Sequence, residues 1–119
     1  MIELAQHEKE KYRRQMMIPG FGEEAQLKLK NSHALVTRVG GLGGPVALYL
    51  AMAGIGKLTI AHAKNLTWSN LNRQILMRGD SVGKPRIPQA VETLNRANPD
   101  VEVVGLEDRD PVTRTVELL

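Results

Sequence analysis

A cluster of glycines near residue 40 is the first feature of the sequence whose spacing points to chemistry. It lies in the segment LVTRVGGLGGP at 35 to 45, between an apolar run and a stretch rich in alanine and leucine. This order is typical of a strand, a phosphate-binding turn and a helix, in which the tight backbone lets amides approach a phosphate. Gly40, Gly41 and Gly43 are therefore candidate phosphate-binding residues, although the same turn also serves helix packing without a ligand.

Arg38 occupies a position where such a turn usually has another glycine. The favoured interpretation is a side chain that fills a disused pocket and hydrogen-bonds to carbonyl groups. The alternative is an arginine that binds a different anion, because a guanidinium group pairs well with phosphate. The sequence leaves both interpretations open.

Two further polar residues could take part in binding or catalysis. His62 has no carboxylate or serine partner at a recognisable spacing, so a structural histidine is favoured over a catalyst. Arg73 lies in the polar segment SNLNRQ at 69 to 74, where it could equally hold the loop or bind an anion. The 3 histidines are scattered and there are 0 cysteines, so we predict no metal site.

The composition is ordinary for one globular domain and excludes several classes of protein. Of 119 residues, 42% are hydrophobic and 24% are charged. The net charge of +3 is too small and too dispersed to favour a nucleic-acid partner. The longest apolar stretch, 45 to 55, is far shorter than the roughly 20 residues that a membrane span needs. We therefore expect a cytoplasmic protein with no nucleic-acid or membrane partner.

Turn residues divide the chain into elements of regular length. The patterns predict helices over 2 to 17, 23 to 30, 43 to 53 and 84 to 97, strands over 33 to 38, 57 to 61 and 101 to 106, a polar connection over 65 to 79, and a terminal helix or tail over 112 to 119. This order predicts an α/β fold: half of a doubly wound, Rossmann-like fold, with three parallel strands and helices on both faces. Residues 1 to 30 would be an N-terminal helical arm, and residues 31 to 119 a truncated nucleotide-binding domain.

The first predicted strand, 33 to 38, should have one unpaired edge, because no fourth strand follows in this sequence. Unpaired apolar edges invite pairing with another chain. We therefore expect a protein partner, as a second copy in a homo-oligomer or as a different subunit, that pairs at this edge.

Four segments carry a resemblance to a known family. They are YRRQMMIPGFGEEAQLKLKNSHALV at 12 to 36, GGLGGPVALYLAMAGIGKLTI at 40 to 60, SNLNRQ at 69 to 74, and VGKPR with LNRANPDVEV within 82 to 103. They resemble the nucleotide-binding half of the ThiF, MoeB and HesA proteins, bacterial relatives of ubiquitin-activating enzymes. The resemblance implies adenylation: ATP and magnesium would activate the C-terminal glycine carboxylate of a ubiquitin-like sulfur carrier, which would be a further protein partner.

The resemblance also implies roles for individual residues. The glycine turn at 40 to 43 would bind phosphates, and Asn70 and Arg73 would belong to the polar loop of the site. Arg14 matches an arginine that family dimers lend to the neighbouring subunit. The candidate catalytic residues are Arg14, Arg73 and Arg86. The candidate cofactor-binding residues are Arg38, Gly40, Gly41, Gly43, His62, Asn70 and Arg73.

The departures from the family pattern are concentrated at these positions. Arg38 replaces the first glycine of the turn, and Arg86 replaces a lysine that contacts the triphosphate. His62 and Lys64 stand where the family has an aspartate for the ribose and a second acid, so that two potential cations replace two anions. The family regions with the magnesium-binding aspartate and the zinc-binding cysteine pairs have no counterpart in these residues.

These departures leave two hypotheses for function. In the first, the chain is a shortened, degenerate relative of the activating enzymes that acts as a binding or scaffolding subunit in an oligomer. In the second, it is an adenylyltransferase component that still binds ATP or another phosphate ligand, with a partner chain supplying the missing acids. The first is favoured because several separate requirements of the reaction are missing, and it predicts weak nucleotide binding.

Overall fold

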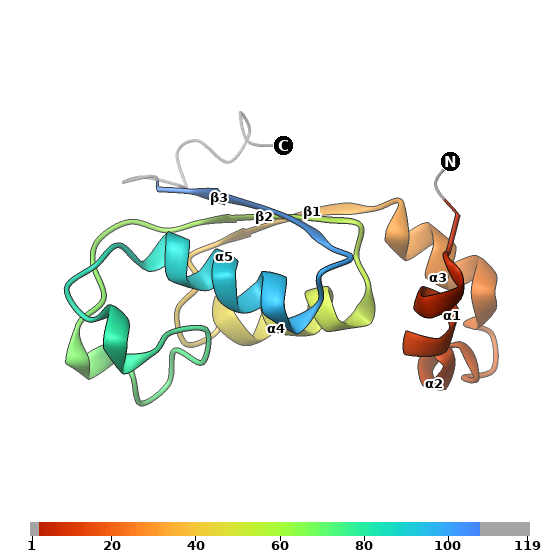
Figure 1. Cartoon of the computed structure of the whole chain (residues 1–119), viewed down its shortest axis with the longest axis horizontal. Coiled ribbons are helices and arrows are strands. Elements are labelled where there is room, and N and C mark those ends of the chain that lie inside the picture. The colour runs from red at the N-terminus through yellow and green to blue at the C-terminus, as the bar shows by residue number, and fades with distance from the viewer. Residues whose placement is uncertain (1–2, 108–119) are drawn as a thin grey trace.

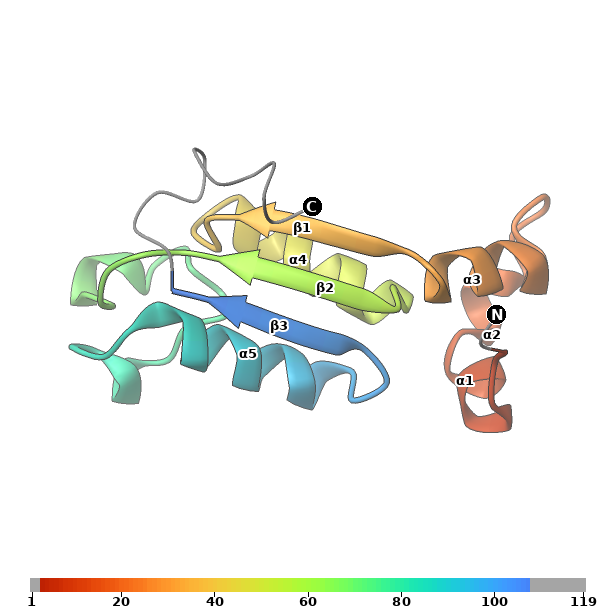
Figure 2. The ribbon, with the colours of Figure 1, turned by 90° about the horizontal axis from the view of Figure 1, so that it is seen from above.

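Three parallel strands form the centre of the molecule, which is described here by a computed structural model that covers residues 3–107. The strands are β1 (His33–Thr37), β2 (Lys57–Ala61) and β3 (Glu102–Leu106), paired in the order β1-β2-β3. They are in register, so that their last residues lie side by side at one edge of the sheet (Figures 1 and 2). The predicted strands and their parallel arrangement are therefore confirmed, to within one residue at each end.

Both crossover helices cover the same face of this sheet. The helices are α4 (Gly43–Ala53) and α5 (Arg86–Ala97), and Figure 1 shows both on one side of the strands. The prediction of helices on both faces is wrong for the described residues. The reason is topological: β1, β2 and β3 follow one another in one direction across the sheet. Right-handed crossovers that run in one direction place all their helices on one face.

The core lies between this face and the two helices. Leu58 and Ile60 of the central strand are fully buried, and Ala47, Ala51 and Leu94 of the helices pack in the same cluster. The apolar positions of α5, Ile87, Ala90 and Leu94, recur at helical spacing, which explains why this segment forms an amphipathic helix. Helix α4 has the predicted bounds and ends at Gly54, whose φ of 98° suits glycine.

The N-terminal arm is made of three helices instead of the two that were predicted. They are α1 (Gln6–Lys11), α2 (Arg13–Met16) and α3 (Gly22–Lys30), so the single helix expected over 2 to 17 is interrupted at Tyr12. Tyr12 is buried, and its hydroxyl accepts a hydrogen bond of 2.8 Å from Asn98 Nδ2 at the end of α5. This tertiary contact competes with a continuous helix. The division of the chain at residue 30 stays a prediction.

The connection between β2 and α5 is less polar than predicted. It contains two short 3-10 turns, Trp68–Asn70 and Gly79–Ser81, and it contributes Leu66 and Leu76 to the core. These buried anchors fix the loop that carries Asn70 and Arg73. Within residues 3–107, no helix is long and apolar enough to cross a membrane. The helix or tail predicted over 112 to 119 lies outside the described residues.

Candidate functional site

A cleft of about 760 Å³ opens at the carboxyl ends of β1 and β2. The glycine turn, the first residue after β2, the polar loop and the first residue of α5 meet there, as expected where parallel strands end together. The residues that line the cleft are Thr37, Arg38, Gly40, Gly41, Leu42, Gly43, His62, Asn70, Arg73, Gln74 and Arg86. The fold thus brings together every candidate site residue except Arg14.

The glycine turn presents backbone groups to this cleft. A Cβ atom on Gly43 would lie 1.9 Å from the carbonyl oxygen of Arg38, so the turn has no room for a side chain there. Among the described residues, the amides of Gly41, Leu42 and Gly43 donate to no backbone carbonyl. Free amides at the start of a helix are suited to binding an anion.

Arg38 does not fill the cleft. Its side chain is exposed and makes no hydrogen bond or ion pair with any residue of the described chain. The interpretation of Arg38 as a plug that bonds carbonyl groups is therefore wrong. Its φ of 66° lies in the left-handed region, which explains why a glycine would suit this position.

Replacing Arg38 with glycine tests both the strain of its left-handed backbone and the contribution of its exposed charge to anion binding. We expect the free energy of unfolding to rise by up to about 1 kcal/mol, because relief of the left-handed strain slightly exceeds the entropy that glycine loses on folding. The affinity for phosphate anions should fall about threefold, since one positive charge leaves the rim. Urea unfolding and calorimetric titration with tripolyphosphate measure the two effects. Tighter anion binding in Arg38→Gly would restore the plug interpretation.

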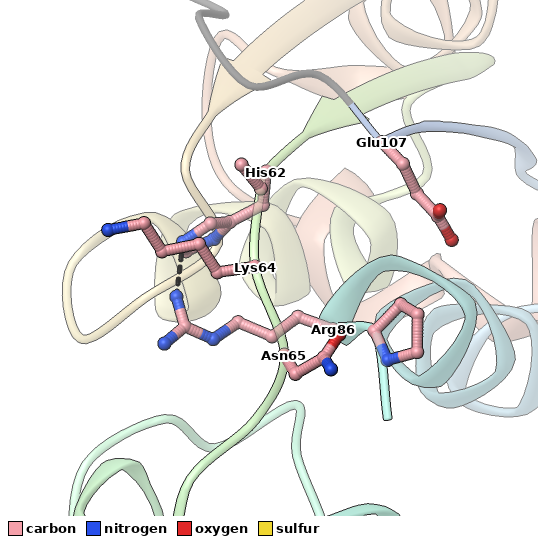
Figure 3. Close-up of a pocket in the computed structure, with 7 residues that line it drawn as sticks. His62, Lys64, Asn65, Arg86 and Glu107 are labelled. Atoms are coloured by element: carbon pink, nitrogen blue, oxygen red, sulfur yellow. Dashed lines mark hydrogen bonds between the residues drawn. The ribbon is translucent and has the colours of Figure 1, made fainter. Parts of the chain in front are cut away.

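A hydrogen-bonded chain of three side chains crosses the floor of the cleft. Arg86 Nη1 donates to His62 Nε2 at 2.6 Å, as the dashed line in Figure 3 marks. Arg86 Nη2 donates to Asn70 Oδ1 at 2.9 Å. A guanidinium group can only donate, so His62 accepts at Nε2 and carries its proton on Nδ1. Asn70 is itself held in place, because the Thr67 amide donates to Asn70 Oδ1 at 2.9 Å.

His62 is neutral at physiological pH. Burial, with the charges of Arg86 and Arg38, lowers the pKa of its imidazole to about 4. Burial and the charge of Arg73 also lower the pKa of Arg86. The expectation of a second cation at position 62 is therefore corrected: His62 is a neutral residue in the lining of the cleft. Of the two potential cations that replace the family's acids, Lys64 therefore carries the positive charge.

The lowered pKa of His62 makes stability depend on pH. The unfolded chain binds a proton at this residue near pH 6.5, whereas the folded chain does so only near pH 4. The free energy of unfolding should therefore fall as pH drops from about 6.5 to 4, by about 1–2 kcal/mol after allowance for solvent screening. Urea unfolding across this range measures the effect. His62→Asn, which has no titrating ring, should lose most of this slope, and an unchanged slope would contradict the assignment.

Three buried polar atoms on residues that line the cleft have no hydrogen-bond partner in the described part of the chain. They are His62 Nδ1, Gln74 Oε1 and Arg86 Nε, which are the buried side-chain atoms without a hydrogen bond among residues 3–107. Nearly all buried polar groups in proteins are paired, so bound water or a ligand is expected to pair with these three groups. Gln74 was missed as an individual site residue, although it is the last residue of the SNLNRQ segment.

Arg73 is positioned by its own loop. Its Nη1 donates to the Ser69 carbonyl at 3.0 Å and to Asn72 Oδ1 at 2.9 Å, and its side chain lies 3.4 Å from the position of a Cβ atom on Gly41. The loop-holding interpretation of Arg73 is thus correct. The guanidinium group also lines the cleft beside the glycine turn, so the same contacts orient it toward a ligand.

The cleft fits phosphate groups and does not fit magnesium. No carboxylate lines it, and the part of the chain that the structure describes has no group of three His, Asp or Glu side chains suited to a metal. Magnesium needs one or two carboxylates besides phosphate oxygens. Three arginines and free amides instead provide what a phosphate needs.

Arg14 lies away from this cleft. It belongs to α2, which Figure 2 shows beyond the opposite ends of the strands. The side chain is exposed. Arg14 therefore cannot complete the cleft of its own chain, and its role at a neighbouring subunit's site stays a proposal.

Comparison with known proteins agrees with this arrangement. The model of the ThiF family matches residues 12–119. The chain belongs to the ThiF family. The protein HesA of Leptolyngbya boryana is 56% identical over 108 residues, and the adenylyltransferase and sulfurtransferase uba4 of Aspergillus clavatus is 44% identical over 96 residues. These matches cover 91% and 81% of this chain.

A solved structure of the same fold contains a nucleotide. The E. coli tRNA N6-threonylcarbamoyladenosine dehydratase TcdA in complex with ATP superposes with a TM-score of 0.86 and is 25% identical, covering 99% of this chain and 49% of that one. The chain spans 39% of the length of the HesA relative and 20% of the uba4 relative. The activities of these longer proteins therefore pass to this chain only as proposals.

Proposed function

We propose that this ThiF-family chain is a binding module for phosphate groups and contributes binding rather than chemistry to an assembly. The observation that carries the proposal concerns residues 3–107: a cleft lined by three arginines and no carboxylate, in which three lining residues have a buried polar atom without a partner. A cleft that binds polyanions through cations alone needs no metal ion to neutralise them. The ATP bound by the TcdA relative makes a nucleotide the first ligand to test.

Each part of the cleft has a defined task in this proposal. The free amides of the turn at 40 to 43 hold one phosphate at the start of α4, where the helix dipole favours negative charge. Arg73 and Arg86 flank the polyphosphate, and exposed Arg38 adds a charge at the rim. Arg86 is oriented by its bonds to His62 and Asn70, so its donor geometry is set before the ligand arrives.

The second candidate is an adenylyltransferase component that becomes active with a partner chain. The open cleft and the arginines that line it favour this candidate, because they can hold the ATP phosphates. The carboxylates for magnesium would come from the partner, as would recognition of a sulfur carrier's C-terminus. ATP–pyrophosphate exchange by the chain with its partner, and none by the chain alone, would support this candidate.

A protein partner is proposed at the free edge of β1. This strand lies at the end of the sheet, and no strand pairs with its outer edge among residues 3–107. Helix α4, which packs against β1 and β2, also exposes the apolar side chains Val46, Tyr49 and Met52. We expect size-exclusion chromatography with light scattering to report a species larger than the monomer. A monomer at every concentration would contradict this part of the proposal.

Calorimetric titration with ATP and with inorganic tripolyphosphate, in EDTA and in magnesium, tests the main proposal. We expect both ligands to bind in EDTA with dissociation constants on the order of 100 µM, as a few charge-assisted hydrogen bonds allow. Magnesium should weaken binding, because it competes with the arginines for the same phosphate oxygens. Absence of heat in both buffers, or binding only with magnesium, would show the proposal to be wrong.

A further inference from the structure

A second hollow adjoins the cleft where the chain leaves β2. It has a volume of about 470 Å³ and shares the side chains of His62 and Arg86 with the cleft. Lys64, Asn65 and Pro85 also line the hollow. In Figure 3 the Lys64 ammonium and the Arg86 guanidinium lie on the side away from Glu107. A ligand that fills both spaces would pass the His62–Arg86 pair, with one group at the glycine turn and another beyond the end of β2.

The hollow carries an excess of positive charge. Lys64 is exposed and makes no hydrogen bond or ion pair within the described part of the chain, and Arg86 has a buried Nε without a partner. The carboxylate present is that of Glu107, which lies on the far side and is turned away from Lys64 and His62 in Figure 3. Lys64 has a φ of 72°, so its position is held in the left-handed region.

The wall between the two spaces offers a donor where a ribose-binding site needs an acceptor. The guanidinium of Arg86 occupies His62 Nε2, so the N–H of Nδ1 is left buried and unpaired. In nucleotide-binding α/β folds, an acid after the second strand accepts hydrogen bonds from ribose hydroxyls, whereas a basic group there accommodates a phosphate on the ribose. His62 and Lys64 are the residues that follow β2 in this chain.

We propose that the hollow beyond β2 binds a phosphate carried on the 2′ or 3′ position of a ribose, so that the module prefers nucleotides phosphorylated at both the 5′ position and the ribose. The His62 N–H, the Lys64 ammonium and the Arg86 guanidinium are its donors. The inference rests on the proposed function, because the 5′ phosphate would occupy the glycine turn. An unmodified ribose leaves the Lys64 charge unused and gives the His62 N–H no anionic acceptor.

Titration of the full chain in EDTA with adenosine 2′,5′-bisphosphate, adenosine 3′,5′-bisphosphate and ADP tests the inference. All three ligands carry two phosphates, so that they differ in where the second phosphate sits and only modestly in total charge. We expect one bisphosphate to bind about tenfold more tightly than ADP, as one added charge-assisted contact provides. Comparison of the two bisphosphates shows whether the hollow binds a phosphate on the 2′ or on the 3′ position of the ribose.

Substitutions of residues that line the hollow show whether the preference comes from a specific site or from general attraction of anions to the chain. Lys64→Gln keeps the length of the side chain and should reduce the preference to about threefold or less. His62→Asp supplies an acceptor and should reverse the preference in favour of ADP. Lys57→Gln removes the same charge from the opposite end of β2 and should leave the preference unchanged. In nitrogen NMR of the wild type, the His62 Nδ1–H signal should shift on binding of the preferred bisphosphate.

The outcomes distinguish the inference from the function on which it rests. If ADP and tripolyphosphate bind but neither bisphosphate binds more tightly than ADP, the ribose-phosphate inference is wrong and the phosphate module stands. If the preference exists but Lys57→Gln weakens it as much as Lys64→Gln does, the hollow is not its source and the inference is also wrong. If none of the ligands binds, both proposals fail.

Discussion

Replacing Arg86 with methionine should weaken tripolyphosphate binding by about 10-fold to 100-fold, the effect of removing a hydrogen bond to a charged group in a partly buried site. Methionine keeps the apolar stem of the side chain and removes the guanidinium group. Calorimetric titration in EDTA measures the loss. Arg96→Met is the matched control, because Arg96 lies on the same helix α5 with its side chain 72% exposed and outside the cleft.

The same variant has a second readout that a general loss of stability would not produce. The charge of Arg86 is one of the causes of the lowered pKa of His62, so Arg86→Met should raise that pKa toward its ordinary value. Proton NMR of the imidazole ring follows the titration. An affinity within threefold of the wild type, with the His62 pKa unchanged, would contradict the role assigned to Arg86.

Replacing Gly43 with alanine should destabilise the fold by about 1–3 kcal/mol, the typical range for substitutions that force backbone shifts in a packed region. The added methyl group would lie 1.9 Å from the Arg38 carbonyl oxygen and 3.4 Å from Val36 Cγ1, so the turn would have to open. Anion binding should be lost with it, since the free amides of the turn would move. Urea unfolding measures the first effect.

Gly40→Ala is the matched control within the same turn. A Cβ atom on Gly40 would have the Gln74 and His62 side chains as its nearest neighbours, at 3.7 Å and 3.9 Å, which are ordinary contacts. We expect its cost to stay below about 1 kcal/mol, as for substitutions without a steric conflict. Equal stability losses in the two variants would show that the turn is not as tightly constrained as the structure indicates.

Local sequence signals were sufficient for most elements of the fold. The bounds of α4 follow from Pro45 in its first turn and from Gly54 after its end, and β2 follows from a short apolar run between turn residues. The break at Tyr12 could not be predicted this way, because it depends on a contact with Asn98, 86 residues further along the chain. The side of the sheet on which helices lie depends on strand order and crossover handedness rather than on local pattern.

The membership of the site was more predictable than its chemistry. Parallel strands end at one edge, so the residues that follow them had to meet, and the glycine turn, His62 and Arg86 do so. The neutral state of His62 could not be read from its residue type, because burial and two arginines distant in sequence determine it. The left-handed φ of 66° at Arg38 likewise could not be read from the sequence, because an arginine rarely adopts it.

The ThiF-family resemblance predicted adenylation, and the structure retains only part of what adenylation needs. Groups suited to binding phosphate line the cleft, whereas no carboxylate of the described chain lines it. The first hypothesis from the sequence, a binding subunit, predicted weak nucleotide binding because several requirements of the reaction are missing. The exposed Arg38 side chain leaves the cleft open, so the structure does not obstruct a phosphate ligand there. The proposed binding role is compatible with the proposed phosphate-binding cleft.

A crystal structure of the chain grown with ATP in the presence of EDTA tests the central claim most directly. We predict electron density for the triphosphate against the amides of the glycine turn and the guanidinium groups of Arg73 and Arg86, with no metal ion beside it. An empty cleft at saturating ATP, or a triphosphate bound elsewhere on the chain, would contradict the account.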